Sequence, residues 1–325
     1  PSSTQTIVAI GYKMGGRLLA LLTMLVWALP VLILMTLLSF SSEFLGNMNI
    51  PQDGLRYIGP MAVGFITVAA YNIGRKVVTD KITTLLLLLG SIITYFIREP
   101  WIYPLVLILG GVVSIIVSKE KNLWNRVKIN PPWGYLIVFG IFAIGGILLN
   151  LIWDNRIIYL FESFYRYGYL VIGGGQVVVP LMYSELVEVN KFMTNQEFLT
   201  GYGLVQGMPG PMFSFSAYAG GMAARGGGVV AQILGAMAGG IGIFLPGLLL
   251  IYFIYPIWEN LKKIKGIKVS LKGVTAVACG LITAVAIVLM QKNGFMIDNI
   301  IVIFITIILL LIKKIPAPVI VIIVL

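Results

Sequence analysis

Long apolar stretches separated by short polar connections dominate this sequence. Residues 17–40 and 134–153 are clear examples, and the second contains no charged residue. A helix of about 20 apolar residues crosses the roughly 30 Å hydrocarbon core of a bilayer. Charged residues make up only 11% of the 325 positions, whereas a soluble domain carries about 25%. So little charge cannot cover a water-soluble surface, and we predict an all-α, multi-pass integral membrane protein.

The apolar stretches predict about ten transmembrane helices. They cover residues 17–40, 58–73, 82–97, 101–117, 134–153, 157–183, 198–221, 227–257, 274–290 and 297–312, with a further short stretch at 316–325. The stretch 198–221 is interrupted by glycine and proline, so we expect a broken or re-entrant segment there. The stretch 227–257 is long and contains Pro246, which favours two short spans or one kinked span.

A polar connection divides the chain. Residues 118–132 hold four basic side chains and end in two prolines, so we take 1–117 as a first half and 133–325 as a second half. By the positive-inside rule this basic linker faces the cytoplasm. The net charge of +11 resides in such connections, where it orients helices, and predicts no nucleic-acid partner.

The composition excludes several kinds of chemistry. The chain has no histidine and a single cysteine, Cys279, which excludes His/Cys metal sites, a disulfide framework and Ser-His or Cys-His catalysis. It also lacks a Walker-type phosphate loop, so we expect no ATP hydrolysis, no cofactor and no enzyme. Transport of a solute is the favoured function. A membrane enzyme acting on lipid-linked substrates and a membrane scaffold are the broader alternatives.

The two halves resemble each other. Three segments of the first half recur in the second in the same order: residues 1–11 as 211–221, 29–30 as 245–246, and 64–67 as 280–283. The last two pairs are separated by the same distance along the chain, which favours an internal duplication. Many secondary transporters are built from such repeats, with the binding site at the repeat interface near the membrane midplane.

Two glycine-rich segments are candidate anion sites. The first is Gly173-Gly174-Gly175-Gln176, where backbone N–H groups can converge on an anion without obstruction by side chains. The second is a helix break whose freed amides and hydroxyls can serve the same purpose, formed by Gln206, Pro209, Gly210, Pro211, Ser214 and Ser216. The structural alternatives are close helix packing for the first and a simple kink or re-entrant turn for the second.

Ionisable residues also occur within the apolar stretches. Glu162 and Arg166 are spaced i, i+4 on one helix face and can pair. Charged groups at membrane depth are functional candidates, so Arg166 is a predicted anion ligand. Glu162 and Glu185 are predicted to carry protons or to couple charge. An interfacial ion pair outside the membrane core is the alternative for Glu162 and Arg166.

These segments together resemble the chromate ion transporter family, in its two-domain, long-chain form. The resemblance rests on residues 173–181, on 198–211 with the Pro-Gly-Pro motif, and on 213–220, and it extends over nearly the whole chain. Residues 1–5 resemble the end of the equivalent Pro-Gly-Pro motif in the first half. On this comparison we expect that an N-terminal segment of the family is missing from this sequence.

The resemblance implies a function. It implies export of chromate from the bacterial cytoplasm across the inner, plasma membrane, and resistance to chromate as a result. Sulfate has the same charge and shape, so transport of sulfate or another anion is the alternative. The expected partners are this oxyanion and the lipid bilayer, and a homo-oligomer is left open.

Overall fold

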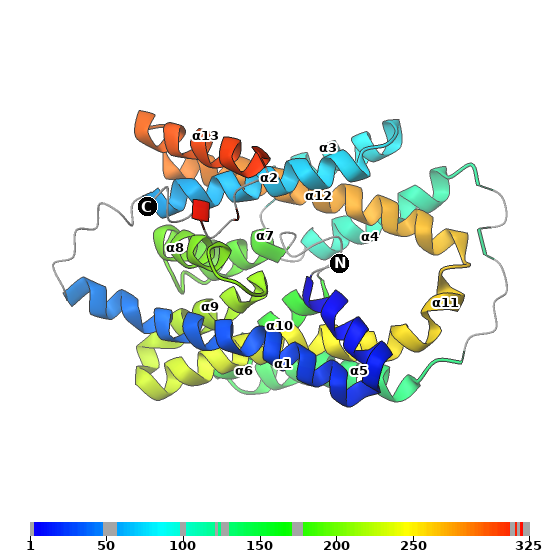
Figure 1. Cartoon of the computed structure of the whole chain (residues 1–325), viewed down its shortest axis with the longest axis horizontal. Coiled ribbons are helices and arrows are strands. Elements are labelled where there is room, and N and C mark those ends of the chain that lie inside the picture. The colour runs from blue at the N-terminus through cyan, green and yellow to red at the C-terminus, as the bar shows by residue number, and fades with distance from the viewer. Residues whose placement is uncertain are drawn as a thin grey trace.

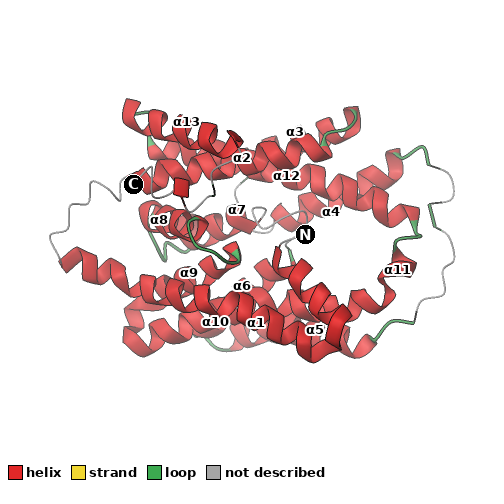
Figure 2. Cartoon of the chain, in the orientation of Figure 1, coloured by secondary structure: helices red, strands yellow, loops and turns green. Residues whose placement is uncertain are grey.

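The computed structural model of the chain describes residues 3–47, 57–97, 102–120, 123–124, 130–170, 178–312, 316 and 319–320. Helices account for nearly all of these residues, and no strand occurs among them (Figures 1 and 2). Four helical stretches are long and apolar enough to span a bilayer: Thr4–Ser41, Trp133–Ile152, Met212–Leu261 and Lys265–Gln291. Three shorter apolar helices accompany them. The prediction of an all-α membrane protein is confirmed.

The helices follow the predicted order. They are α1 (Ser3–Asn47), α2 (Ile58–Val77), α3 (Lys81–Phe96), α4 (Ile102–Val117), α5 (Trp133–Ile152), α6 (Arg156–Tyr169), α7 (Val178–Tyr183), the π-helix η3 (Ser184–Val189), α8 (Asn195–Gln206), α9 (Phe215–Ala224), α10 (Gly228–Ile254), α11 (Trp258–Leu261), α12 (Lys265–Asn293) and α13 (Ile297–Ile312). The predicted short stretch 316–325 lies almost entirely outside the described residues.

The ends of two long helices differ from the prediction. Helix α12 begins at Lys265 rather than near residue 274, because a lysine in its first turns can extend its ammonium group away from apolar surroundings. Helix α1 begins at Ser3 rather than near residue 17 and is interrupted at Gly15 and Gly16. Gly16 has φ of 69° and ψ of −154°, a conformation that essentially only glycine adopts.

A second glycine break separates α9 from α10. Gly228 there has φ of 82° and ψ of −179°. This conformation is close to that of Gly16. Beyond the breaks, α1 and α10 continue through Pro30 and Pro246 without interruption. Of the two expectations around Pro246, two short spans are not observed: α10 is one helix, because membrane helices tolerate proline where neighbouring groups satisfy the freed carbonyl.

The helices form two groups with shorter helices between them (Figure 1). Helix α12 packs against α2, α3 and α4, and α13 packs against α2. On the other side of the molecule, α10 packs against α1, α5, α6 and α9. Helix α8 joins the groups, since it contacts α2 as well as α1 and α9. The predicted break between α8 and α9 therefore lies where the two groups meet.

Small residues allow the helices to approach closely. A Cβ atom at Gly64 of α2 would lie 2.8 Å from Thr306 Cβ and 3.4 Å from Ile303 O, both in α13. A Cβ atom at Gly280 of α12 would meet Leu87 and Ser91 of α3 in the same way. Such glycine contacts are typical of membrane helix packing, in which apolar side chains gain little by leaving lipid.

Candidate functional site

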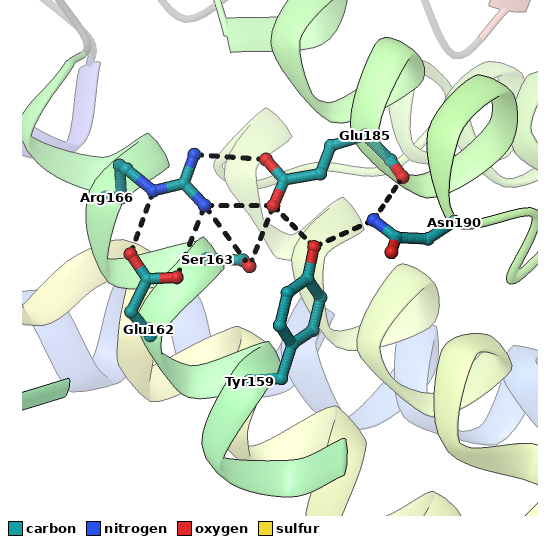
Figure 3. Close-up of polar contacts among 6 residues, drawn as sticks. All are labelled: Tyr159, Glu162, Ser163, Arg166, Glu185 and Asn190. Atoms are coloured by element: carbon teal, nitrogen blue, oxygen red, sulfur yellow. Dashed lines mark hydrogen bonds and ion pairs between the residues drawn. The ribbon is translucent and has the colours of Figure 1, made fainter. Parts of the chain in front are cut away.

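Three ionisable side chains form a cluster inside the helix bundle (Figure 3). Arg166 of α6 donates through Nε to Glu162 Oε1 at 2.8 Å and through Nη2 to Glu162 Oε2 at 3.2 Å. Its Nη1 and Nη2 atoms donate to Glu185 Oε2 and Oε1 at 3.0 and 2.9 Å. Glu162 and Glu185 are only 8% and 4% exposed. The two carboxylates are therefore buried, whereas the Arg166 side chain is 24% exposed.

Neutral side chains complete this cluster. Tyr159 Oη and Ser163 Oγ donate to Glu185 Oε1 at 2.6 and 3.1 Å. Asn190 Nδ2 donates to Tyr159 Oη at 2.7 Å and to the Glu185 carbonyl at 2.8 Å. Tyr159, Ser163 and Arg166 share one face of α6, whereas Glu185 lies in η3 (Figure 3). A π-helical turn of this kind is rare and is frequent at functional sites.

The charges of this cluster do not balance. Two carboxylates share one guanidinium, so the ionised cluster carries one net negative charge. Arg166 is the predicted anion ligand, yet most of its N–H donors already bind Glu162 and Glu185. A free anion reaches Arg166 only if one carboxylate withdraws or becomes protonated. The geometry thus assigns Arg166 first to charge compensation.

The predicted helix break lies between α8 and α9. Helix α8 starts with a capping box, in which Thr194 Oγ1 accepts from the Glu197 amide and Glu197 Oε2 accepts from the Thr194 amide. It ends at Gln206, and the chain then turns through Pro209, Gly210 and Pro211. A short 3-10 turn, Met212–Ser214, leads into α9.

Gly210 brings this turn against the long helix α1. A Cβ atom at Gly210 would overlap the Val31 side chain. Gly168, near the end of α6, is similarly confined: a Cβ atom there would lie 2.5 Å from both the Ile243 carbonyl oxygen and Pro246 Cγ. These glycines are therefore required for close approach of the segments to α1 and α10.

Several buried polar atoms at the break have no hydrogen-bond partner in the described parts of the chain. The Oγ atoms of Ser214 and Ser216 are unpaired, in residues that are 0% and 1% exposed. Gln206 Nε2 is also buried and unpaired, and so is Thr4 Oγ1 near the start of α1. A buried polar atom without a partner costs about 1–3 kcal/mol, so such a group requires an explanation. Binding of a polar ligand by these atoms is one such explanation.

Two small cavities lie beside the break. One has a volume of about 20 Å³ and is lined by Thr4, Gly168 and Phe213 among others. The other has a volume of about 10 Å³ and is lined by Val178, Phe213 and Ser216 among others. One water molecule needs a cavity of about 10–15 Å³ on this measure, so neither holds a tetrahedral oxyanion as it stands.

The first glycine-rich motif, Gly173, Gly174, Gly175 and Gln176, lies outside the described residues. Gly168, which precedes it in the sequence, lines the first cavity, and Val178, which follows it, lines the second. Both cavities are also lined by Phe213, in the short turn that follows Pro211.

Comparison with known proteins decides the family. The family model described as chromate transporter matches residues 1–115 and 158–325, which is most of the chain. The chain belongs to the chromate transporter family. No solved structure matches it. Membership places this protein among transporters rather than enzymes.

Named relatives agree with this membership. A chromate transport protein of Cupriavidus metallidurans is 25% identical over 99% of this chain and 77% of its own length. A chromate transport protein of Pseudomonas aeruginosa is 26% identical over 90% of this chain and 69% of its own length. An uncharacterized transporter of Methanocaldococcus jannaschii is 24% identical, covering 96% of this chain and 77% of its own length.

Sequence reasoning on this chromate transporter family member missed several polar groups. Tyr159, Ser163 and Arg166 are spaced i, i+4 and i+7, which places them on one face of a helix. This spacing is a sequence signal that could have identified Tyr159 and Ser163 as neighbours of Arg166. Thr4 aligns with Ser214 when residues 1–11 are placed on 211–221, so the repeat itself points to Thr4. Asn190 carries no such signal, because its place depends on the path of η3.

Proposed function

We propose that this protein exports chromate, or a similar tetrahedral oxyanion such as sulfate, from the cytoplasm across the inner membrane. Export of chromate would lower its concentration in the cell and confer resistance. The family membership and the names of the relatives support chromate as the substrate. The buried, unpaired hydroxyls of Ser214 and Ser216 at a helix break are the observation that carries the proposed site.

The physical requirement for such a site is severe. Even a monovalent ion faces a Born cost of order 20 kcal/mol on leaving water for an apolar medium. The protein must replace the hydration shell with hydrogen-bond donors. Ser214 Oγ, Ser216 Oγ and Gln206 Nε2 are buried groups that can donate and have no hydrogen-bond partner among the described residues. We propose that they bind the oxyanion, together with backbone amides near Pro209–Pro211.

Residues of the first half belong to the same site on this proposal. Thr4 Oγ1 is unpaired like Ser214 Oγ, and Thr4 lines a cavity together with Phe213. The sequence repeat pairs Thr4 with Ser214. The glycine breaks at Gly16 and Gly228, with similar backbone angles, support the same correspondence. Gly173–Gln176 remains a predicted part of the site.

The small cavities fit a transporter with an occluded site. Because the volumes of about 20 and 10 Å³ are too small for the anion, binding requires the helices around the break to separate. In repeat-built transporters one bundle rocks against the other around a site near the midplane. We propose that the two helix groups move in this way, opening the site alternately to each side.

The buried ion cluster is the proposed coupling element. Glu162 and Glu185 share Arg166, so a proton on one carboxylate would neutralise the cluster and free part of the guanidinium. Arg166 could then face an anion that approaches from the neighbouring break. This step links proton uptake to anion binding without any further group.

The amount of chromate that cells retain provides the first test. We would measure labelled chromate retained by cells expressing this protein, beside cells with an empty vector, with and without excess sulfate. Lower retention in the expressing cells supports chromate export. Equal retention, with the protein confirmed in the membrane, would contradict it. Sulfate that abolishes the difference would indicate a shared site for both oxyanions.

A further inference from the structure

A groove between α2 and α12 is separate from the site described above. It has a volume of about 420 Å³. Tyr71 and Ile287, which line it, are 50% and 39% exposed, so the groove opens at the surface of the protein. In a multi-pass membrane protein this surface is covered by lipid. The groove is a place where a lipid chain can lie between helices.

Positions related by the predicted repeat line this groove from its two helices, α2 and α12. Four pairs of lining residues have the sequence spacing of the repeated segments 64–67 and 280–283: Thr67 and Thr283, Ala70 and Ala286, Tyr71 and Ile287, and Gly74 and Met290. The two helices thus contribute lining residues at corresponding sequence positions. Comparison of these positions shows which features of the groove are specific to one helix.

Only one of the two helices contributes a cation. Arg75 lines the groove, and its guanidinium lies over the Tyr71 ring at 5.6 Å from the centroid. No carboxylate of the described residues pairs with it. Gln291 takes the corresponding position in α12 but is not among the described residues that line the groove, and its Nε2 donates to Tyr95 Oη at 3.1 Å. The predicted repeat therefore has a cation on α2 and a neutral, bonded amide at the corresponding position of α12.

A second groove provides a comparison within the same molecule. It lies between α1 and α10, has a volume of about 450 Å³, and is also lined by pairs such as Leu29 and Leu245. Apart from Thr36, its described lining residues are apolar or glycine, and none is charged. The two grooves have nearly equal volumes, and only the α2–α12 groove has a charged residue, Arg75, among its described lining residues.

The combination of an apolar groove and a terminal guanidinium fits one class of ligand. We propose that the α2–α12 groove binds an anionic phospholipid, with an acyl chain along the groove and the headgroup phosphate on Arg75. Arginine presents a planar fork of donors that matches phosphate, and basic pockets between membrane helices bind anionic headgroups. Lys76 and Lys81 lie near the same end of α2, which makes this end the cytoplasmic one by the positive-inside rule.

Titration with lipids of matched chains tests this proposal. We would titrate the purified protein in detergent with phosphatidylglycerol, with phosphatidylcholine of the same chains, and with inorganic phosphate, and record bound lipid by native mass spectrometry and the melting temperature. Phosphatidylglycerol should bind and raise the melting temperature more than either other ligand. Arg75→Gln should weaken phosphatidylglycerol binding about fivefold, the typical contribution of one basic residue at an anionic surface.

Two further variants complete the experiment. Lys263→Gln removes an exposed charge outside the groove and should leave lipid binding unchanged. Ile287→Trp narrows the groove at an exposed position and should weaken lipid binding while Arg75 is intact. Unchanged phosphatidylglycerol binding in both Arg75→Gln and Ile287→Trp would overturn the proposal. So would equal binding of phosphatidylcholine, and a comparable shift with inorganic phosphate would indicate a free-anion site instead.

Discussion

Arg166 Nη2 donates to Glu185 Oε1 at 2.9 Å, which joins α6 to the π-helix η3 across residues 171–177. The two residues are 19 positions apart, and the predicted motif Gly173–Gln176 lies between them. The ion pair therefore connects α6, which precedes that motif in the sequence, to η3, which follows it. It does so inside the bundle, where the 4% exposure of Glu185 keeps water away from the contact.

Neutralising Glu185 should be more damaging than neutralising Glu162. Glu185 accepts from Arg166, Tyr159 and Ser163, whereas Arg166 is the only side chain of the described residues that donates to Glu162. Removal of one partner of a buried ion pair costs up to about 3–5 kcal/mol. We expect Glu185→Gln to lower the melting temperature of the purified protein more than Glu162→Gln.

The matched control for this pair of variants is Glu259→Gln. Glu259 pairs with Lys262 on the surface, and its side chain is 80% exposed. Exposed pairs contribute about 0–1 kcal/mol, so this variant should melt close to the wild type. Equal melting temperatures for the Glu185 and Glu162 variants would show that the additional hydrogen bonds of Glu185 do not contribute.

Glu162→Gln should also uncouple transport from protons. Glutamine keeps the shape of the side chain but cannot gain or lose a proton at this position. In everted membrane vesicles, a pH gradient should change the rate of chromate uptake by the wild type and should not change it in the variant. Uptake without a gradient should persist. A gradient response of normal size in Glu162→Gln would remove this carboxylate from the coupling step.

Gly210 should not tolerate a large side chain. A Cβ atom at this position would overlap Val31 of α1, so Gly210→Leu must displace the break between α8 and α9. We expect loss of most chromate transport at a normal level of protein in the membrane. Gly140→Leu is the control, because a Cβ atom there has no neighbouring atom within 4 Å. Retention assays in which both variants behave as the wild type would contradict the site.

Asp80 provides a prediction about pH. Its carboxylate accepts from Lys272 Nζ at 2.6 Å and from the Thr83 amide at 2.8 Å, and these contacts, Lys272 first, lower the pKa of Asp80 to about 2. Because this pKa is lower in the folded protein than its ordinary value of about 3.9, the ionised carboxylate stabilises the fold at pH values above about 3.9. This stability is lost as the pH falls from there toward 2. The melting temperature should therefore decrease over that interval.

Two substitutions of Asp80 separate its two roles. Asp80→Asn keeps an oxygen that can cap α3 but removes the charge, and should cost less than about 1 kcal/mol at pH 7. Asp80→Ala also removes the cap and should cost about 1–2 kcal/mol. Near pH 2.5, the difference in melting temperature between Asp80→Asn and the wild type should become smaller. A difference that stays constant with pH would show that the ion pair with Lys272 does not contribute.

The sequence predicted those features that follow from local chemistry. Apolar stretches located α5 and α13 to within one residue at each end, since length and hydrophobicity alone determine a span. The prolines at 209 and 211 located the helix break, because proline lacks the amide hydrogen that a helix needs. The i, i+4 spacing located the pair of Glu162 and Arg166.

Features that depend on tertiary structure were not predictable in this way. Glu185 reaches Arg166 only because the chain returns through α7 and ends in a π-helical turn. The early start of α1 at Ser3 depends on packing against α10, where Val8 is buried in a cluster with Leu248 and Tyr252. Whether the hydroxyl groups of Ser214 and Ser216 have hydrogen-bond partners depends on the packing of every neighbouring helix, and no sequence pattern predicts that packing.

Chromate uptake by everted vesicles carrying the double substitution Ser214→Ala and Ser216→Ala is the most direct test of the proposed site. Because both hydroxyls are buried and unpaired, their removal should leave the melting temperature unchanged or raise it. Each hydrogen bond to a charged ligand contributes about 1.5–3 kcal/mol, so uptake at low chromate concentration should fall at least about tenfold.

Ser114→Ala serves as the control in the same vesicles. Ser114 Oγ donates to the Val269 carbonyl at 2.8 Å, away from the break. This variant should therefore have a lower melting temperature but take up chromate at the wild-type rate. The account predicts loss of uptake without loss of stability in the double variant, and the reverse in Ser114→Ala. Uptake of the double variant at the wild-type rate would contradict the assignment of the oxyanion site to the start of α9.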